Sequence, residues 1–179
     1  SVRQRIAARP SERRPTRWRT GRGTVSASLP SALTTATPPG AAPSSQEIQA
    51  RRPMAPLDSR MGIEVTEASL EKVVARMPVE GNTQPFGLLH GGANCVIAES
   101  VGSIAATIHG YPTHYAVGVE INCSHHRGVR EGWVTATATP IKVGRQVASF
   151  HIEITDEAGA SVATARLTCL LQPYDPPPA

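Results

Sequence analysis

The chain has 179 residues, which is one ordinary domain with some length left over, and 40% of them are hydrophobic, enough for a core. Aromatic residues make up only 4%, so that core must be aliphatic, which suits packed strands and a small-residue helix. The chain has a net charge of +4, but residues 1–52 hold ten basic and two acidic residues, a net of +8. The other eight basic and twelve acidic residues give residues 53–179 a net charge of −4, which argues against a nucleic-acid-binding domain.

Residues 1–52 are of low complexity, Arg-rich at first and then rich in Ser, Thr, Ala and Pro. Such a composition buries too little apolar surface to offset the entropy of ordering, so we expect a disordered tail. The composition is also typical of an organellar transit peptide, and a third interpretation puts the functional start at Met54 or Met61. The Pro-rich residues 174–179 are expected to follow a domain that spans residues 53–173.

Periodicity predicts two strands that form a hairpin, a loop, one long helix and then four more strands. The expected strands are residues 62–66, 70–78, 115–123, 132–143, 146–155 and 161–171. The helix is expected at residues 89–109, because this stretch lacks Pro, is apolar on most faces and is closed by Gly110 and Pro112. A helix that is apolar nearly all round must be covered, and a curling sheet is the simplest cover, with small residues such as Gly102 allowing close approach. The expected fold class is α+β, a curled antiparallel sheet wrapped around one long central helix.

The three cysteines, Cys95, Cys123 and Cys169, are widely spaced, which argues against a disulfide framework and fits a reducing cytoplasm. No C-x-x-C, H-x-x-x-H or H-E-x-x-H spacing occurs, so the sequence predicts no metal site and no cofactor. No apolar stretch reaches the ~20 residues that a membrane-spanning helix needs. We therefore expect a cytoplasmic protein with no membrane partner.

Glu99 is the anomaly of the predicted helix, because this carboxylate lies among apolar residues and has no Lys or Arg three or four positions away. An ionised carboxylate buried without a partner is costly, which favours a functional role. The alternative is that Glu99 lies on an exposed stripe of the helix. Ser103 follows four residues later, on the same helical face and within reach of Glu99 or of a water that it holds.

The run His90-Gly91-Gly92 falls where the loop enters the helix, at which backbone N–H groups lack internal partners and carry the positive end of the dipole. Glycines let a substrate carbonyl approach those donors, which is the chemistry of an oxyanion site, although an ordinary turn before a helix explains the run equally well. Gln84, in the same loop, would supply a second hydrogen bond. Together with Glu99, the pattern predicts carboxylate-assisted attack on a polarised carbonyl, without a G-x-S-x-G nucleophile elbow.

Segments 84–92 (QPFGLLHGG) and 98–103 (AESVGS) resemble the hotdog-fold thioesterases, and the resemblance covers about residues 58–172. The pattern is most similar to the branch that holds the 1,4-dihydroxy-2-naphthoyl-CoA thioesterase of menaquinone synthesis, the enterobactin proofreading thioesterase and certain 4-hydroxybenzoyl-CoA thioesterases. The helix within a curled antiparallel sheet that this family has agrees with the fold expected from periodicity.

The resemblance implies that Glu99 is the catalytic carboxylate, acting as nucleophile or as general base for water. It implies that the Gly91 amide, assisted by Gln84, polarises the thioester carbonyl. His90 would orient the thioester, and Ser103 would position the water of Glu99.

The resemblance also implies a site formed between two subunits, with a homodimer as the minimal unit, usually doubled to a tetramer. The residues expected to contact the substrate or its coenzyme A are Gly92, Gly118, His125, His126, Arg127, Gly128, Lys142, Gly144 and Arg145. Arg127 and Arg145 suit phosphates, because a guanidinium pairs well with phosphate, and solvated turn arginines are the alternative. Coenzyme A enters here as part of the substrate and not as a cofactor.

Hydrolysis of an aromatic acyl-CoA is the leading hypothesis, with 1,4-dihydroxy-2-naphthoyl-CoA as the first choice and carrier-protein thioesters left open. A hotdog hydratase or dehydratase is a second hypothesis, which the lack of its usual His/Asp or His/Glu motif disfavours. A non-catalytic acyl-CoA or acyl-carrier binder is the third. Side chains such as Phe86, Leu88, Val101 and Ile104 are expected to shape the acyl pocket.

Overall fold

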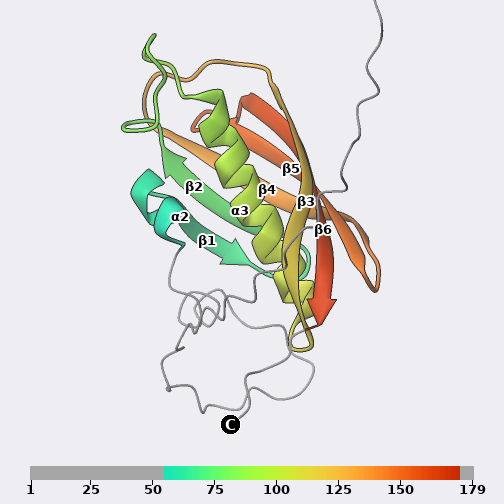
Figure 1. Cartoon of the computed structure of the whole chain (residues 1–179). Coiled ribbons are helices and arrows are strands. Elements are labelled where there is room, and N and C mark those ends of the chain that lie inside the picture. Colours follow the sequence, from blue (N-terminus) through green and yellow to red (C-terminus); the bar gives the residue numbers. More distant parts are fainter. Residues whose placement is uncertain (1–54, 174–179) are drawn as a thin grey trace, which may run out of the picture. The chain divides into compact units, whose positions relative to one another are not determined.

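The computed structural model describes residues 55–173. The predictions of a tail at residues 1–52 and of a Pro-rich end at residues 174–179 lie outside the described residues. In chain order, the elements are α2 (Pro56–Met61), β1 (Glu64–Ala68), β2 (Val73–Pro78), α3 (Gly91–Gly110), β3 (His114–His125), β4 (Trp133–Val143), β5 (Val147–Asp156) and β6 (Ser161–Pro173). The predicted hairpin, long helix and four later strands are all present (Figure 1).

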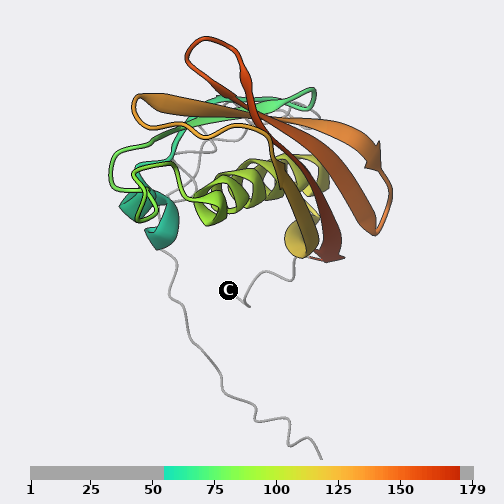
Figure 2. The ribbon, with the colours of Figure 1, turned by 90° about the horizontal axis from the view of Figure 1, so that it is seen from above.

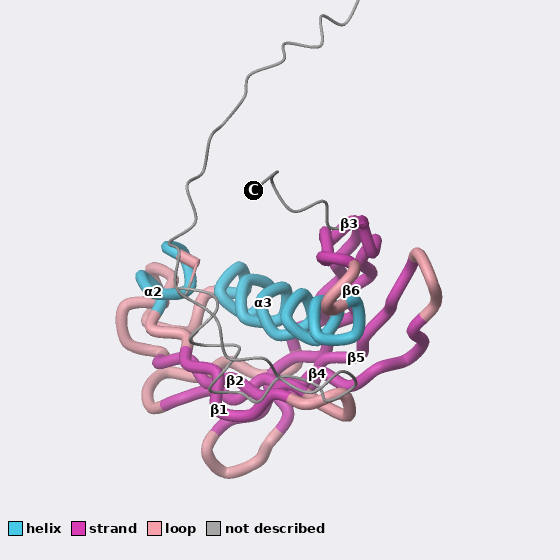
Figure 3. Tube along the Cα trace, turned by 90° about the horizontal axis from the view of Figure 1, so that it is seen from below, coloured by secondary structure: helices cyan, strands magenta, loops and turns pink. Residues whose placement is uncertain are grey.

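The strands form one six-stranded antiparallel sheet in the order β1-β2-β4-β5-β6-β3. Figure 2 shows the sheet arching over α3, with β3 and β6 curling down beside the helix. Figure 3 shows that α3 lies against one face of this sheet. Burial alternates along β2, β4 and β5, because successive side chains of a strand point to opposite faces. The buried face packs on α3 around Phe150, and the predicted α+β architecture is confirmed.

α3 approaches β6 closely at Gly102, as the small residues of the helix predict. A Cβ atom placed on Gly102 would lie 2.5 Å from Cδ2 and 3.1 Å from Cβ of Leu167. Leu167 is fully buried, so its side chain has little room to move. Glycine at this position therefore allows helix and sheet to share one core.

We expect Gly102→Leu to lower the free energy of unfolding by about 1–3 kcal/mol through overpacking. Helix propensity alone predicts the opposite sign, because Leu is favoured over Gly in a helix interior by roughly 0.8 kcal/mol. Denaturant unfolding followed by circular dichroism measures the difference. An unchanged or increased free energy of unfolding would show that helix propensity outweighs the close packing of Gly102 on Leu167.

β3 is the edge strand beside α3, and within residues 55–173 it pairs only with β6. Its register shifts between Gly118 and Glu120, which leaves Val119 as the extra residue of a β-bulge. The bulge moves the side-chain alternation by one residue, so Gly118 before it and Cys123 after it both face α3. The bulge thus decides which β3 side chains meet the helix.

The sequence does not predict α2, which has Pro56 in its first turn and spans only six residues, too few to show a helical period. Asp58 of α2 accepts a hydrogen bond of 2.7 Å from the Ser100 hydroxyl, which ties α2 to α3. The predicted first strand at 62–66 begins too early. Gly62 ends α2 with a φ of 68°, a left-handed conformation that favours glycine, and β1 starts at Glu64.

Candidate active site

One face of α3 looks toward β3 and is half-buried in the single chain. One helical turn apart along this face lie Gly91, Cys95, Glu99 and Ser103. The opposing strand contributes Gly118, which lies against Glu99, and His125, which lies against Gly91. Helix and strand therefore bring most of the predicted catalytic residues to one surface.

The Glu99 carboxylate has two immediate neighbours. Ser103 Oγ donates a hydrogen bond of 3.1 Å to its Oε1, as the four-residue spacing predicts. A Cβ atom placed on Gly118 would lie 3.1 Å from Cδ of Glu99 and would overlap Oε1. Glu99 belongs to none of the ion pairs found between residues 55 and 173. Its side chain is half-buried, which is intermediate between the buried position and the exposed stripe that the sequence left as alternatives. Gly118 thus packs on the candidate catalytic group.

The Cys169 thiol on β6 lies near this carboxylate, because Cys169 is the pairing partner of Gly118 on β3. Burial, with a contribution from the negative charge of Glu99, raises the pKa of the Cys169 thiol to about 11, against an opposing hydrogen bond with Ser103. Sequence reasoning did not connect Cys169 with the site. Only the register between β3 and β6 brings the two together.

The N-terminus of α3 presents an unused backbone donor. His90 is the N-cap of the helix, and its Nδ1 accepts a hydrogen bond of 2.8 Å from the Gly92 amide. The Gly92 amide is thereby occupied, whereas the Gly91 amide has no hydrogen-bond partner among the described residues. Because Nδ1 accepts, the proton of the neutral His90 ring resides on Nε2, where it can be donated. The structure therefore assembles donors suited to a developing oxyanion.

Gln84 lies in the loop that leads into α3. Its Oε1 accepts a hydrogen bond of 3.0 Å from the Phe86 amide, which leaves its NH₂ group as the available donor. In this loop, Phe86 is 81% exposed and Leu88 is half-buried, and Ile104, much further along α3, is half-buried as well. Val101 is fully buried in the core, so the prediction that it lines an acyl pocket is wrong. Its position on the sheet-facing side of α3 explains the difference.

The residues predicted to contact coenzyme A fall into two groups in the single chain. The first lies at the end of β3 and just after it, near the N-terminus of α3. Here a Cβ atom on Gly91 would lie 2.9 Å from Nε2 of His125, and Nδ1 of His125 lies 3.3 Å from Nδ2 of Asn94. The imidazole thus packs directly against Gly91.

The next three residues of this group make contacts with the body of the domain. His126 Nε2 lies 2.9 Å from the Thr164 hydroxyl, and the Arg127 guanidinium pairs with Asp156 at 3.2 Å. A Cβ atom on Gly128 would lie 3.0 Å from Leu88, so the chain passes close to the loop before α3. Arg127 is exposed but already has a carboxylate partner, which makes it less free for a phosphate than the sequence suggests.

The second group lies at the other end of α3, a helix about 30 Å long by its twenty residues. Lys142 and Arg145 are exposed there, and Gly144 forms the turn between β4 and β5. Gly144 and Arg145 border a hollow of about 800 Å³ that also includes His109 and His114. One chain therefore does not bring all the predicted substrate contacts together.

Near the N-terminus of α3, the structure also brings together two cysteines and a buried amide. Cys95 on α3 faces Cys123 on β3, and burial together with the neighbouring Cys95 raises the pKa of the Cys123 thiol to about 11. Asn94 is only 3% exposed, and its Oδ1 has no hydrogen-bond partner within the described part of the chain. All three cysteines are free thiols. Sequence spacing missed these residues because they come from separate elements.

Comparison with known proteins identifies the class. Residues 86–163 match the model of the thioesterase superfamily. The chain is 42% identical over 113 residues to the proofreading thioesterase EntH of Cronobacter turicensis, covering 63% of this chain and 82% of that protein. A thioesterase structure from Haemophilus influenzae superposes with a TM-score of 0.67 at 35% identity, covering 72% of this chain and 90% of that one. A mutant thioesterase from Pseudomonas aeruginosa superposes with a TM-score of 0.67 at 37% identity, covering 72% and 94%.

The chain therefore belongs to the thioesterase superfamily, and its curled sheet around α3 is the hotdog fold. It is a thioester hydrolase. Within residues 55–173, no helix has both the length and the apolar character needed to span a membrane.

Proposed function

We propose that the chain hydrolyses aromatic acyl-CoA thioesters through Glu99, with 1,4-dihydroxy-2-naphthoyl-CoA as the first substrate to test. The observation that carries this proposal is the α3 face on which Ser103 holds the Glu99 carboxylate and Gly91 keeps its amide free. A base and a backbone donor on one accessible face are the groups that thioester hydrolysis requires. The accessible Phe86 and Ile104 offer apolar surface for the acyl group.

In the proposed mechanism, the Gly91 N–H and the NH₂ group of Gln84 donate to the carbonyl oxygen as it gains negative charge. Glu99 either takes a proton from the water that attacks the carbonyl carbon or attacks that carbon itself, and water then cleaves the resulting anhydride. In both routes the C–S bond breaks, the thiolate of coenzyme A leaves and is protonated, and the free acid is released. Nε2–H of His90 orients the thioester, and Ser103 holds the carboxylate in place.

The spacing of the catalytic groups on α3 supports an active site shared by two subunits. Gly91 and Glu99 are eight residues apart, which corresponds to a rise of about 12 Å along the helix. One carbonyl must lie about 3 Å from the oxyanion donor and within reach of the attacking group. A second α3 running antiparallel across the half-buried face would bring Glu99 of the partner subunit to the free Gly91 amide.

The open edge of the sheet supports a homodimer of this kind. β3 leaves its outer edge unpaired in the described structure, and it carries the exposed apolar residues Val117 and Val119. Unpaired strand edges are prone to pair with another strand, and here a second β3 would continue the sheet. We propose that this dimer doubles to a tetramer, as the family resemblance implies.

We expect the double substitution V117D/V119D to convert the dimer to an inactive monomer, because a two-fold axis would place like charges opposite one another. The matched control is I141D/V147D. Its two positions are 57% and 44% exposed, against 43% and 52% for the β3 pair, and they lie away from the open edge. This control is compared by mass alone, because aspartates there flank Lys142 and Arg145. Sedimentation velocity reports the mass and thiol release reports the activity. A wild-type monomer with full activity would contradict the shared site.

The acyl specificity is tested by a panel of substrates on the full chain. We expect kcat/KM to be highest for 1,4-dihydroxy-2-naphthoyl-CoA and benzoyl-CoA, and lower for straight-chain acyl-CoA of similar size. An acylated carrier protein separates coenzyme A from carrier substrates, and crotonyl-CoA, whose hydration consumes the enoyl absorbance, tests the hydratase alternative. Higher kcat/KM for straight chains would overturn the aromatic assignment while leaving thioester hydrolysis intact.

Preference for the naphthoyl substrate would place the enzyme in cytoplasmic menaquinone synthesis. Lys142 and Arg145 are the cations proposed to meet the phosphates of coenzyme A, since both are exposed at the turn between β4 and β5. A non-catalytic binder is disfavoured by the intact pairing of Glu99 with Ser103.

A further inference from the structure

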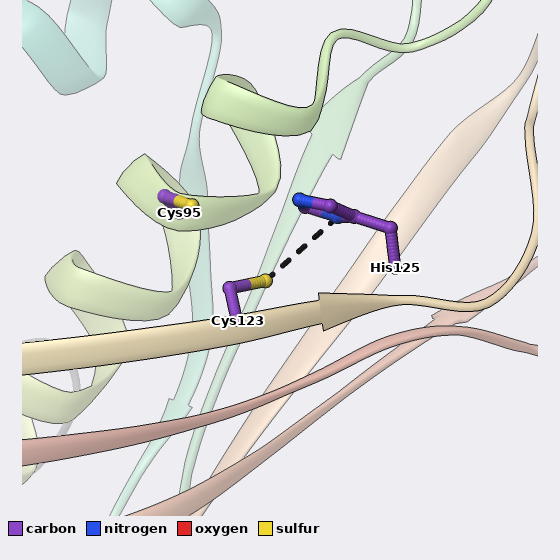
Figure 4. A group of neighbouring side chains, drawn as sticks. All are labelled: Cys95, Cys123 and His125. Carbon is purple, nitrogen blue, oxygen red and sulfur yellow. Dashed lines mark hydrogen bonds between the residues drawn. The ribbon is translucent and has the colours of Figure 1, made fainter.

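Three soft ligands converge between α3 and β3 at the centre of the half-buried face. Cys95 comes from α3, and Cys123 and His125 come from β3, where two-residue spacing puts both on the side that faces the helix. Figure 4 shows the three side chains pointing toward one another. One ligand atom from each residue lies within 4.8 Å of the other two.

We propose that Cys95, Cys123 and His125 bind one soft transition-metal cation of the Zn²⁺ class per chain. Two thiolates and one imidazole are a ligand set that Zn²⁺ prefers. In a tetrahedral zinc site, bonds of about 2.3 Å to sulfur and about 2.0 Å to nitrogen separate two sulfurs by about 3.8 Å and a sulfur from a nitrogen by about 3.5 Å. The 3.9 Å between Cys123 Sγ and His125 Nδ1 is already close to that value.

The orientation of the imidazole fits this role. Nδ1 of His125 faces Cys123, whereas Nε2 faces Gly91, so coordination through Nδ1 requires no rotation of the ring. Rotamer changes of the two cysteines would close the remaining gap, because Cys95 and Cys123 are only half-buried and retain space around them.

Asn94 supplies an independent observation at the same place. This amide is 3% exposed, its Nδ2 lies 3.3 Å from His125 Nδ1, and its Oδ1 has no partner among the residues described. A half-turn of the amide would put the oxygen at the present position of Nδ2. That position is 3.3 Å from Nδ1, about the separation of two neighbouring ligands bound at 2.0–2.1 Å. Asn94 thereby offers an oxygen for the fourth position.

The location gives metal binding a consequence for the enzyme. His125 lies against Gly91 and Cys95 lies one helical turn after it, so the cation would lie beside the proposed oxyanion donor. Occupancy would therefore exclude the thioester and inhibit hydrolysis reversibly. This consequence rests on the proposed function, whereas metal binding itself does not.

The binding test uses the full chain, reduced, stripped of metal and titrated with Co²⁺. We expect one equivalent to bind, with the visible bands of tetrahedral cobalt and a thiolate-to-cobalt charge-transfer band, and Zn²⁺ to displace it. Cys95→Ser and Cys123→Ser should each weaken binding by on the order of 100-fold or more. Cys169→Ser is the matched control and should keep the spectrum, because Cys169 lies outside the cluster.

Two results would overturn the proposal. One is a wild-type protein that shows no thiolate-to-cobalt charge-transfer band. This includes the case in which Cys95 and Cys123 are first found as a disulfide and, once that disulfide is reduced, still bind no cobalt. The other is an equal affinity in the Cys123→Ser and Cys169→Ser variants. A separate experiment measures hydrolysis with added Zn²⁺, and follows the free acid so that the assay does not depend on detecting a thiol. If Zn²⁺ inhibits the wild type at least tenfold more strongly than the Cys123→Ser variant, the inhibitory role is supported. Equal inhibition of the two proteins contradicts the inhibitory role but leaves the conclusion on metal binding unchanged.

Discussion

Glu99→Gln is expected to lower kcat by on the order of 10²–10⁴, the range typical of a lost general base. The amide keeps the size of the side chain and can still meet the Ser103 hydroxyl, but it can neither accept a proton from water nor attack the carbonyl carbon. KM should change little, because the Gly91 amide and Gln84 still bind the carbonyl. Steady-state release of coenzyme A from benzoyl-CoA by purified variants gives both constants.

Glu153→Gln is the matched control for this substitution. Glu153 is an exposed carboxylate on β5, where side chains alternate between the helix face and the outer face, and its neighbours Ile152 and Ile154 are fully buried. Its substitution should leave kcat within about twofold, since a surface change far from the site is usually neutral. Similar kcat values for the Glu99 and Glu153 variants would remove Glu99 from the mechanism.

Gly118→Ala is expected to lower kcat by roughly 10²-fold, because misplacing a catalytic group by about 1 Å can cost this much. The added Cβ would overlap Glu99 Oε1, so the carboxylate must move away from it. The position is exposed on an edge strand, so the fold should tolerate the methyl group, and melting temperature and oligomer mass should stay near wild type. The loss should therefore appear in kcat.

A double-mutant cycle shows whether the effect passes through Glu99. Glu99→Asp shortens the carboxylate and withdraws it from Gly118, so adding Gly118→Ala to this variant should cost much less than adding it to wild type. Fully additive losses, or a Gly118→Ala enzyme with kcat within threefold of wild type, would show that the close contact between the two residues has no part in catalysis.

The sequence predicted the order of elements well because the signals are local. Runs of β character separated by turn residues marked the strands, and the absence of Pro before Gly110 and Pro112 marked α3. The contact between Ser103 and Glu99 was also predictable, since a four-residue spacing on a helix is enough to place it. α2 was missed because its six residues carry no period.

The contacts between α3 and β3 were not predictable in the same way. Strict alternation along β3 would put Gly118 and Cys123 on opposite faces, and only the bulge at Val119 turns both toward the helix. Spacing rules therefore could not predict the cluster of Cys95, Cys123 and His125, because such rules search for ligands that lie on one element. Lys142 and Arg145 lie at the opposite end of α3 from His125, and this separation likewise depends on the direction of β4 relative to α3.

The central claim is that this chain cleaves thioesters at the surface between α3 and β3. The most direct measurement is the release of coenzyme A from benzoyl-CoA and 1,4-dihydroxy-2-naphthoyl-CoA by the purified full chain, with the free acid quantified in parallel. The account predicts equal amounts of thiol and acid, formed far faster than in buffer, and loss of both in Glu99→Gln. A folded wild-type oligomer that releases no more thiol than buffer, or a Glu99→Gln variant as fast as wild type, would contradict it.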